Sequence, residues 1–264
     1  MTDYQTLHTS ETDGVLTVQL NRETARNSFD LTMIAELTAL ARQYRDQTDW
    51  HAIVLCGAEK FFSAGADLSA AGVFQQRGDE APDQAELRRI ARAGGEMCAA
   101  WEALSAVTIV AVEGPCIGAG AALALACDFR ILGSGAMMRF PEVPLGITLS
   151  WDTIPRLVDH IGPALAKEWV MFGDAVDAQT LLQWGVINAC VEQGAAHSTA
   201  LGWAARLQRL PPLPVGLTKR AVQACQTPRN PNEVDEFLLT ATSEDFGEGI
   251  AAFLQKRQPD FKRR

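Results

Sequence analysis

The sequence predicts an α/β fold, because short apolar segments typical of buried strands alternate with longer segments that carry apolar residues at helical spacing. A proline-rich stretch separates an α/β core, residues 1–206, from a C-terminal helical region, residues 207–264. Two turns of small residues, 63–67 and 114–120, each follow a strand-like segment and open a helix-like one. We therefore expect the core to carry the functional site and the tail to complete it.

The first elements follow from local patterns. Val15–Leu20 alternates apolar with polar residues, and Ala52–Cys56 is short and apolar, so both are expected to be strands. Between them, residues 32–44 place apolar side chains at helical spacing, and Asp30 is positioned to cap this helix. The polar, glycine-containing stretch 72–82 is expected to form a loop beside the site.

The middle of the chain continues the alternation. A helix is expected from Leu87 to Leu104, and the apolar segment 108–112 is expected to be a buried strand. The second turn leads into 119–127, an almost wholly apolar helix that must lie inside the core because it has no polar face. A further strand is expected at 129–132.

The tail begins at a helix-breaking segment. Three of the four residues 211–214 are proline, which stops a helix that enters the segment. Residues 215–226 and 232–257 are helix-like and carry more apolar surface than a small appendage can bury by itself. We expect these helices to pack between subunits.

Composition narrows the classes of function. With 264 residues the chain can bury a sizeable core, and its net charge of -9 argues against a nucleic-acid-binding or anionic-membrane-binding surface. The six cysteines form no CxxC pair and no zinc-like spacing with histidine, which favours a reduced, cytoplasmic protein without a metal site. No signal peptide or membrane-spanning run is expected.

The two small-residue turns indicate the chemistry. Small residues let a substrate carbonyl approach the main chain closely. Backbone N–H donors about 2.7 to 3.1 Å from an oxyanion stabilise it strongly. The sequence therefore predicts a site that holds a developing enolate or a tetrahedral oxyanion.

The turns lie within an ordered set of motifs that resembles the enoyl-CoA hydratase/isomerase (crotonase) family. In chain order the set is Leu20-Asn21-Arg22, Ala25-Arg26-Asn27, 60–68, 112–120 with Cys127-Asp128, Phe140-Pro141-Glu142, Pro155-Arg156-Leu157-Val158, 178–185 and 252–257. The resemblance covers nearly the whole chain. It implies a crotonase-like spiral of ββα units in two sheets with a C-terminal helical trimerisation region, assembled as a homotrimer or as a hexamer formed by two trimers. It also implies an acyl-CoA thioester substrate and no separate cofactor.

By the same resemblance, the N–H groups of Ala66 and Ala119 form the oxyanion hole, and Glu142 matches one family carboxylate. The residues that the resemblance assigns to coenzyme A are Lys60, Arg22, Arg26, Ser63, Ala64, Gly65, Leu68, Phe253 and Lys256.

One departure from the family pattern directs the expected mechanism. Ala122 stands where hydratases with two glutamates carry the second one. Hydration requires two acid/base groups, which hold the water and transfer a proton, whereas moving a double bond requires only one base. Glu142 as a single base therefore favours Δ3,Δ2-enoyl-CoA isomerisation.

Two alternatives stay open. One is a hydratase in which Asp152 replaces the missing acid; the other is a non-catalytic member of the fold that binds acyl-CoA or RNA. Whichever reaction applies, Trp151 and Ala122 are expected to line the acyl pocket.

Overall fold

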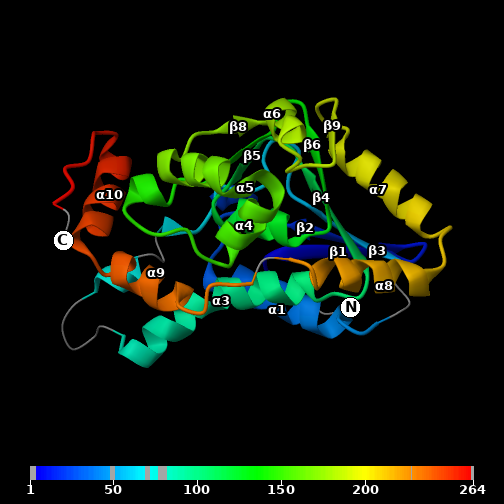
Figure 1. Ribbon diagram of the computed structural model, residues 1–264, viewed down its shortest axis with the longest axis horizontal. Helices are drawn as coiled ribbons and strands as arrows, with labels where there is room; N and C mark the ends of the chain where they lie inside the picture. The colour runs from blue at the N-terminus through cyan, green and yellow to red at the C-terminus, as the bar shows by residue number, and fades with distance from the viewer. Residues whose placement is uncertain (1–3, 48–50, 69–71, 77–81, 227, 263–264) are drawn as a thin grey trace.

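Two β-sheets form the framework of the protein (Figure 1), which a computed structural model describes over residues 4–47, 51–68, 72–76, 82–226 and 228–262. The larger sheet has the order β1-β2-β3-β4-β6-β9, and the smaller one has the order β5-β7-β8. The larger sheet contains β1 (Leu7–Thr12), β2 (Val15–Leu20), β3 (Ala52–Cys56), β4 (Val107–Val112), β6 (Phe129–Gly133) and β9 (Ala189–Val191). The smaller sheet contains β5 (Pro115–Ile117), β7 (Met137–Arg139) and β8 (Val176–Asp177). In the larger sheet β1 pairs antiparallel with β2, and every later pair is parallel.

The described helices are α1 (Leu31–Tyr44), α3 (Gln84–Glu102), α4 (Ala119–Ala126), α5 (Thr153–Phe172), α6 (Ala178–Gln183), α7 (Ala196–Leu207), α8 (Pro212–Gln223), α9 (Glu233–Ala241) and α10 (Glu244–Gln255). Single 3-10 turns occur at η1 (Glu23–Ala25), η2 (Gly72–Gln75) and η3 (Val143–Leu145). Twice a strand of the larger sheet is followed by a strand of the smaller sheet and then a helix, as β4-β5-α4 and as β6-β7-α5 with η3 inserted. The predicted α/β core of repeated ββα units is confirmed.

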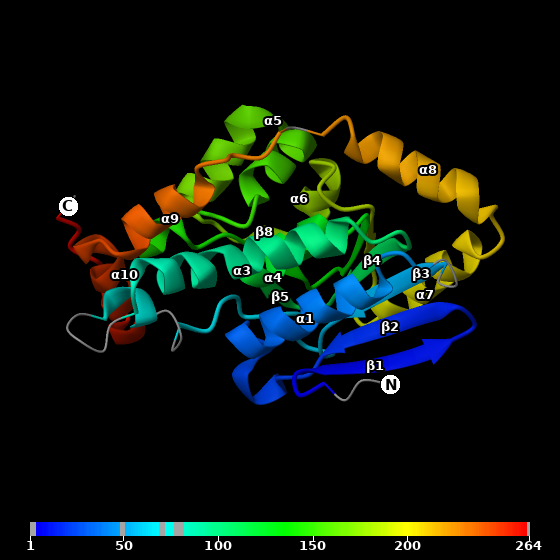
Figure 2. The ribbon, with the colours of Figure 1, turned by 90° about the horizontal axis from the view of Figure 1, so that it is seen from below.

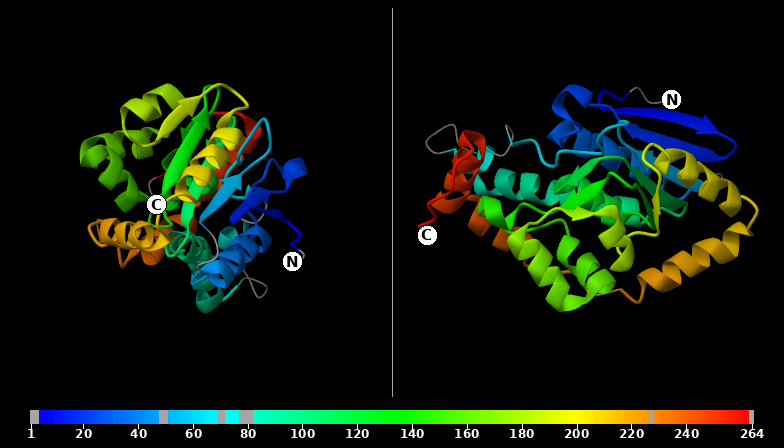
Figure 3. Two further views of the ribbon diagram at one scale, coloured as in Figure 1. Left: turned by 90° about the vertical axis from the view of Figure 1, so that its right-hand side faces the viewer. Right: turned by 90° about the horizontal axis from the view of Figure 1, so that it is seen from above.

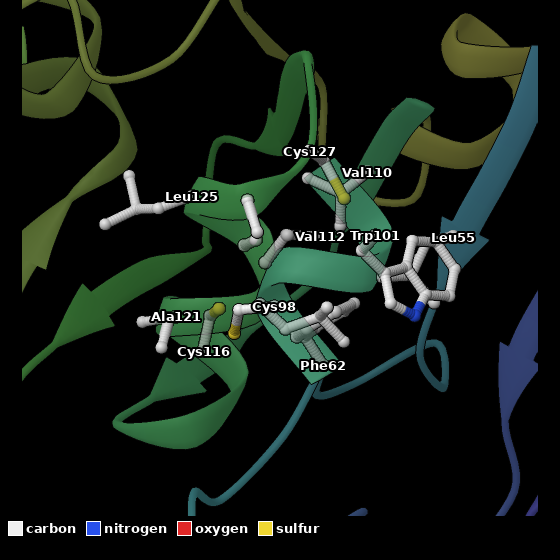
Figure 4. Packing of buried hydrophobic residues seen from close by; sticks show 14 of the residues in the cluster. Leu55, Phe62, Cys98, Trp101, Val110, Val112, Cys116, Ala121, Leu125 and Cys127 are labelled. Carbon is white, nitrogen blue, oxygen red and sulfur yellow. The ribbon is translucent and has the colours of Figure 1, made fainter. Parts of the chain in front are cut away.

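The core lies on both faces of the larger sheet. On one face, the buried alanines of α7 pack against Val54, Ile109 and Ile131. The main cluster on the other face joins the sheet to α1, α3 and α4, and α1 and α3 lie side by side beneath it (Figure 2). Every residue of α4 is buried, as its apolar sequence predicts, and Figure 4 shows Ala121 and Leu125 of this helix within the cluster.

Local sequence signals explain most of the element boundaries. The Asp30 carboxylate caps α1 by accepting the N–H of Met33 at 2.8 Å, as expected. The start of α8 differs from the expectation of 215, because proline is tolerated in the first turn of a helix and α8 begins inside the proline run at Pro212. The expected single helix 232–257 is two helices, since Ser243 caps α10 by accepting the N–H of Phe246 at 3.2 Å.

Some elements carried no clear sequence signal. Strand β1 and the strands of the smaller sheet were not predicted, because edge strands and strands of two or three residues show little alternation. The expected loop 72–82 contains η2, and its residues 77–81 lie outside the described part of the chain. No helix within the described ranges is long and apolar enough to cross a membrane.

The tail contacts the core at opposite ends of the molecule (Figures 2 and 3). Helix α8 is attached to the core by Lys219. Its buried ammonium donates to Asp128 Oδ2 at 2.7 Å and to the carbonyl of Ala106 at 2.9 Å. Helices α9 and α10 instead bury Leu238 and Phe246 against α3 and η2. Helix α10 also packs on η3, where a Cβ on Gly249 would lie 2.2 Å from Leu145 O.

The apolar surface that the tail leaves uncovered predicts self-association. Leu213, Leu239 and Leu254 are 68%, 75% and 68% exposed, which is unfavourable in water for side chains of this size. We expect sedimentation at micromolar concentration to show a trimer or a hexamer. A stable monomer would contradict the expectation. Leu239→Glu should weaken the assembly, whereas Glu236→Gln, at an exposed polar position of the same helix, should leave it unchanged.

Candidate active site

The two small-residue turns are joined by backbone hydrogen bonds. Ser63 and Cys116 form a parallel bridge, in which the N–H of Ser63 donates to Pro115 O at 3.1 Å and the N–H of Ile117 donates to Ser63 O at 3.0 Å. A Cβ on Gly120 would lie 2.6 Å from the Cβ of Ser63, so only glycine permits the approach of α4 to the first turn. The turns thus lie directly against each other.

The first turn leaves the N–H of Ala66 available. Phe29 N–H donates to Gly65 O at 2.8 Å, and Asp67 N–H donates to Phe29 O at 2.9 Å. In a parallel bridge of this kind the residue between the two bonds points its own N–H away from the partner. Ala66 is exposed, and no described group accepts its N–H.

The second turn places Ala119 at the first position of α4. N–H groups in the first turn of a helix have no intrahelical acceptor and favour negative charge. Gly118, which precedes the helix with φ 48°, provides no capping side chain, while its own N–H donates to Arg139 O at 2.9 Å. The N–H of Ala119 is therefore available to a ligand oxygen.

Asn27 supports the first turn in a way that the motif alone did not reveal. Its side chain is fully buried, its Nδ2 donates to Phe62 O at 3.1 Å, and its backbone carbonyl accepts the Ser63 hydroxyl at 2.7 Å. That hydroxyl in turn accepts the N–H of Gly65 at 3.1 Å. Asn27 also adopts a left-handed backbone, φ 51°, which asparagine tolerates better than most residues.

The Glu142 carboxylate lies beside the junction of the turns. It follows β7 and precedes η3, and its Oε1 would be 2.7 Å from a Cβ placed on Gly118. The same Cβ position is 3.9 Å from the Cα of Gly65. The carboxylate is thus close to both turns.

The Glu142 carboxylate is also desolvated. Its Oε2 is buried and has no hydrogen-bond partner among the described residues. Burial raises the pKa of Glu142 to about 7, although its own backbone N–H and Arg139 act in the opposite direction. A carboxyl with this pKa is poised to take up and return a proton near neutral pH.

Asp152 lies in a different environment from Glu142. Its carboxylate pairs with Arg229 at 3.2 Å, and its backbone is left-handed, φ 52°, at the start of α5. It does not hydrogen-bond to Glu142 Oε2, which has no described partner. The structure therefore shows Glu142 as the carboxylate beside the turns and Asp152 as part of an ion pair with the tail.

The two residues predicted to line the acyl pocket lie on different elements. Ala122 is 2% exposed on α4, where its small side chain leaves the position without a carboxylate. Trp151 lies against Phe29, with ring centroids 6.3 Å apart. Because Phe29 is the bridge partner of Ala66, the indole lies on the Ala66 side of the site.

The residues predicted to bind coenzyme A surround the first turn, with two of them on α10. Arg22 is held by Asp30 and Asp67, each at 3.2 Å, whereas Arg26 and Lys60 are exposed. In the first turn, Ser63 and Gly65 are buried, Ala64 is exposed and Leu68 is partly exposed. Phe253 is 58% exposed on α10, and Lys256 follows it at the end of that helix. Their roles toward coenzyme A stay predictions.

Comparisons with known proteins identify the family of this chain. A family model described as enoyl-CoA hydratase/isomerase matches residues 10–264. The chain belongs to the enoyl-CoA hydratase/isomerase family. It is 32% identical to 2,3-dehydroadipyl-CoA hydratase of Escherichia coli strain K12 over 97% of this chain and 98% of that one. It is 33% identical to carnitinyl-CoA dehydratase of Citrobacter koseri over 98% and 99% of the two chains.

Solved structures of the enoyl-CoA hydratase/isomerase family share the fold. An enoyl-CoA hydratase from Bacillus anthracis aligns with a TM-score of 0.76 at 26% identity, covering 98% of this chain and all of the other. The resemblance inferred from the motifs is confirmed, and the protein is an acyl-CoA-binding enzyme of this family. Within the described ranges, no three histidine, cysteine or acidic side chains cluster as metal ligands.

The buried carboxylate predicts an unusual pH dependence of stability. The pKa of Glu142 is raised from 4.5 to about 7, so the folded state binds its proton more tightly than the unfolded chain does. Its contribution to stability is therefore present below about pH 4.5 and is lost as pH rises through about 7. Glu142→Gln removes this dependence, and we expect its free energy of unfolding to gain roughly 2 to 3 kcal/mol relative to the parent between pH 5 and pH 8.

Urea unfolding at the two pH values, at one protein concentration, measures the difference. Glu59→Gln, at an exposed position, is the control and should show no such gain. An equal effect of Glu142→Gln at pH 5 and pH 8 would mean that the carboxylate is not desolvated.

Proposed function

We propose that this enzyme moves a proton at C2 of an enoyl-CoA thioester with Glu142 as its single acid and base, and that Δ3,Δ2-enoyl-CoA isomerisation is its favoured reaction. The observation that carries the proposal is the Glu142 carboxylate, which lies against Gly118 with its Oε2 buried and without a described partner, beside the free N–H groups of both turns. Ala122 supports it, because no carboxylate stands at that position of α4.

In the proposed reaction the thioester oxygen accepts hydrogen bonds from the N–H groups of Ala66 and Ala119. These donors stabilise the negative charge that develops on the oxygen when the C2–H bond breaks. Glu142 takes the proton, and the electron pair spreads over the dienolate that links the thioester to C3 and C4. Glu142 then returns the proton to C4, which moves the double bond from C3 to C2 and regenerates the carboxylate.

Hydration of a 2-enoyl-CoA is the second candidate, and the names of the relatives favour it. They include a hydratase and a dehydratase that align over nearly their whole lengths. Hydration here requires a second group to hold the water, and Asp152 is the candidate that the sequence offers. Its ion pair with Arg229 speaks against that role.

Loss of the Glu142 carboxylate should separate catalysis from binding. Glu142→Gln keeps the side-chain shape, so acyl-CoA affinity should change little, while isomerisation should slow by roughly 10² or more. Incubation with 3-enoyl-CoA and with 2-enoyl-CoA in deuterated water reports isomerisation, hydration and exchange at C2 together. Near-parent turnover of both substrates would show that the base lies elsewhere, and Asp152→Asn would then be the variant to test.

Placing a carboxylate at position 122 of α4 tests the one-base assignment by adding a second acid/base group. Ala122→Glu should raise hydration relative to isomerisation, because it supplies a second group that holds water and transfers a proton. Ala122→Gln has nearly the same volume without the charge and controls for the cost of enlarging a buried residue. An equal ratio of the two activities in both variants would count against the proposed role of this position.

A further inference from the structure

The segment from Glu142 to Asp152 is held along its length by the tail of the same chain. A Cβ on Gly249 of α10 would lie 2.2 Å from Leu145 O, so α10 packs directly on η3. In α9, the hydroxyl of Thr240 accepts the N–H of Thr148 at 3.1 Å. The end of the segment is held by Glu233, the first residue of α9, which accepts the N–H of Asp152 at 2.8 Å.

That end is a tight turn with an unfavourable backbone. Trp151 and Asp152 both lie in the left-handed region, with φ 65° and 52°, although neither is glycine. Arg156 donates from the other side to the carbonyls of Trp151 at 2.7 Å and Asp152 at 2.9 Å. Such a conformation persists only where the surroundings hold it, and here Glu233 and Arg156 hold its N–H and carbonyl groups.

The charges around the turn form one connected set. Arg156 is itself fixed by Glu102 of α3, with contacts of 3.2 and 3.0 Å. Arg229 of the tail pairs with both Glu102 and Asp152. Burial, together with the nearby Asp152 carboxylate, raises the pKa of Glu233 to about 7, although its bonds to backbone N–H groups lower it. The Glu233 carboxylate is thus partly desolvated, unlike a side chain exposed on the surface.

The indole of Trp151 packs against Gly94 of α3. A Cβ on Gly94 would lie 1.8 Å from Cε2 of Trp151, so the ring occupies the space that any other residue at 94 would fill. The indole is only partly buried, and it also lies against Phe29, the bridge partner of Ala66. The ring thus lies between α3 and the residue that pairs with Ala66 in the first turn.

We propose that Trp151, seated against Gly94 and held in place by Glu233, closes the acyl pocket and limits the length of the acyl chain that the enzyme accepts. Trp151 is the specificity-determining residue, and Glu233 is a positioning residue that acts through the turn. The proposal rests on the acyl-CoA site described above, but not on which reaction Glu142 catalyses.

The test measures binding of saturated thioesters, so it needs no turnover. Calorimetric titration with butyryl-CoA and dodecanoyl-CoA gives the ratio of the two affinities for each variant. Trp151→Ala should raise the affinity for dodecanoyl-CoA about tenfold or more and change that for butyryl-CoA less than about threefold, as expected when a pocket gains apolar volume. Gly94→Ala should act in the opposite direction, because the added methyl group displaces the ring from α3 toward the pocket.

The positioning role of Glu233 is tested by removing one or both of the carboxylate oxygens that accept the N–H of Asp152. Glu233→Ala should shift the affinity ratio in the same direction as Trp151→Ala, and Glu233→Gln, which keeps one acceptor oxygen, should shift it less. Glu236→Gln, which changes a charge on the same helix away from the turn, should leave it unchanged. Trp151→Phe provides a milder enlargement of the pocket should Trp151→Ala not fold.

An affinity ratio that stays constant in Trp151→Phe and Gly94→Ala would overturn the proposed role of Trp151. A shift of the same size in Glu236→Gln and Glu233→Gln would overturn the role of Glu233. Failure of the proposed reaction shows itself separately, as exchange at C2 that survives in Glu142→Gln, and leaves the binding ratios unaffected.

Discussion

The site depends on one unfavourable arrangement, a carboxylate held out of water without a hydrogen-bond partner on one of its oxygens. The Glu142 side chain is desolvated against the start of α4, and this raises its pKa to about 7. A folded protein keeps such a group only if the surrounding packing compensates for its cost. Here the compensation comes from α4, which is buried along its whole length, and from the large apolar cluster around it (Figure 4).

The two proposed oxyanion donors, the N–H groups of Ala66 and Ala119, depend on backbone geometry more than on side chains. The bridge between Ser63 and Cys116 fixes the distance between the two turns, and Gly120 allows α4 to approach. The bridge between Phe29 and Ala66 then determines which N–H groups are used internally and which stay free. In the proposed reaction alanine is sufficient at positions 66 and 119, because only the main chain of these residues would contact the substrate.

The tail contributes to the site within its own chain. Helix α10 packs on η3, directly after Glu142, and α9 reaches the turn at Asp152. Glu142 and the Trp151 indole are therefore carried by a single segment whose two ends are held by consecutive helices of the tail. This links the geometry of the proposed site to the docking of residues far away in the sequence.

Residue patterns alone were enough to predict the alternation of strands and helices in the core, the Asp30 cap, the buried character of α4 and the family. These features follow from local periodicity, from short-range hydrogen bonds and from motifs that are recognised by their order along the chain. Which side chains and backbone groups contact each other became evident from the three-dimensional arrangement. The pKa of Glu142, the support of the first turn by Asn27 and the hold of Glu233 on Asp152 all arise between segments distant in the chain. Burial and electrostatic interactions of this kind depend on three-dimensional distance, which no local pattern encodes.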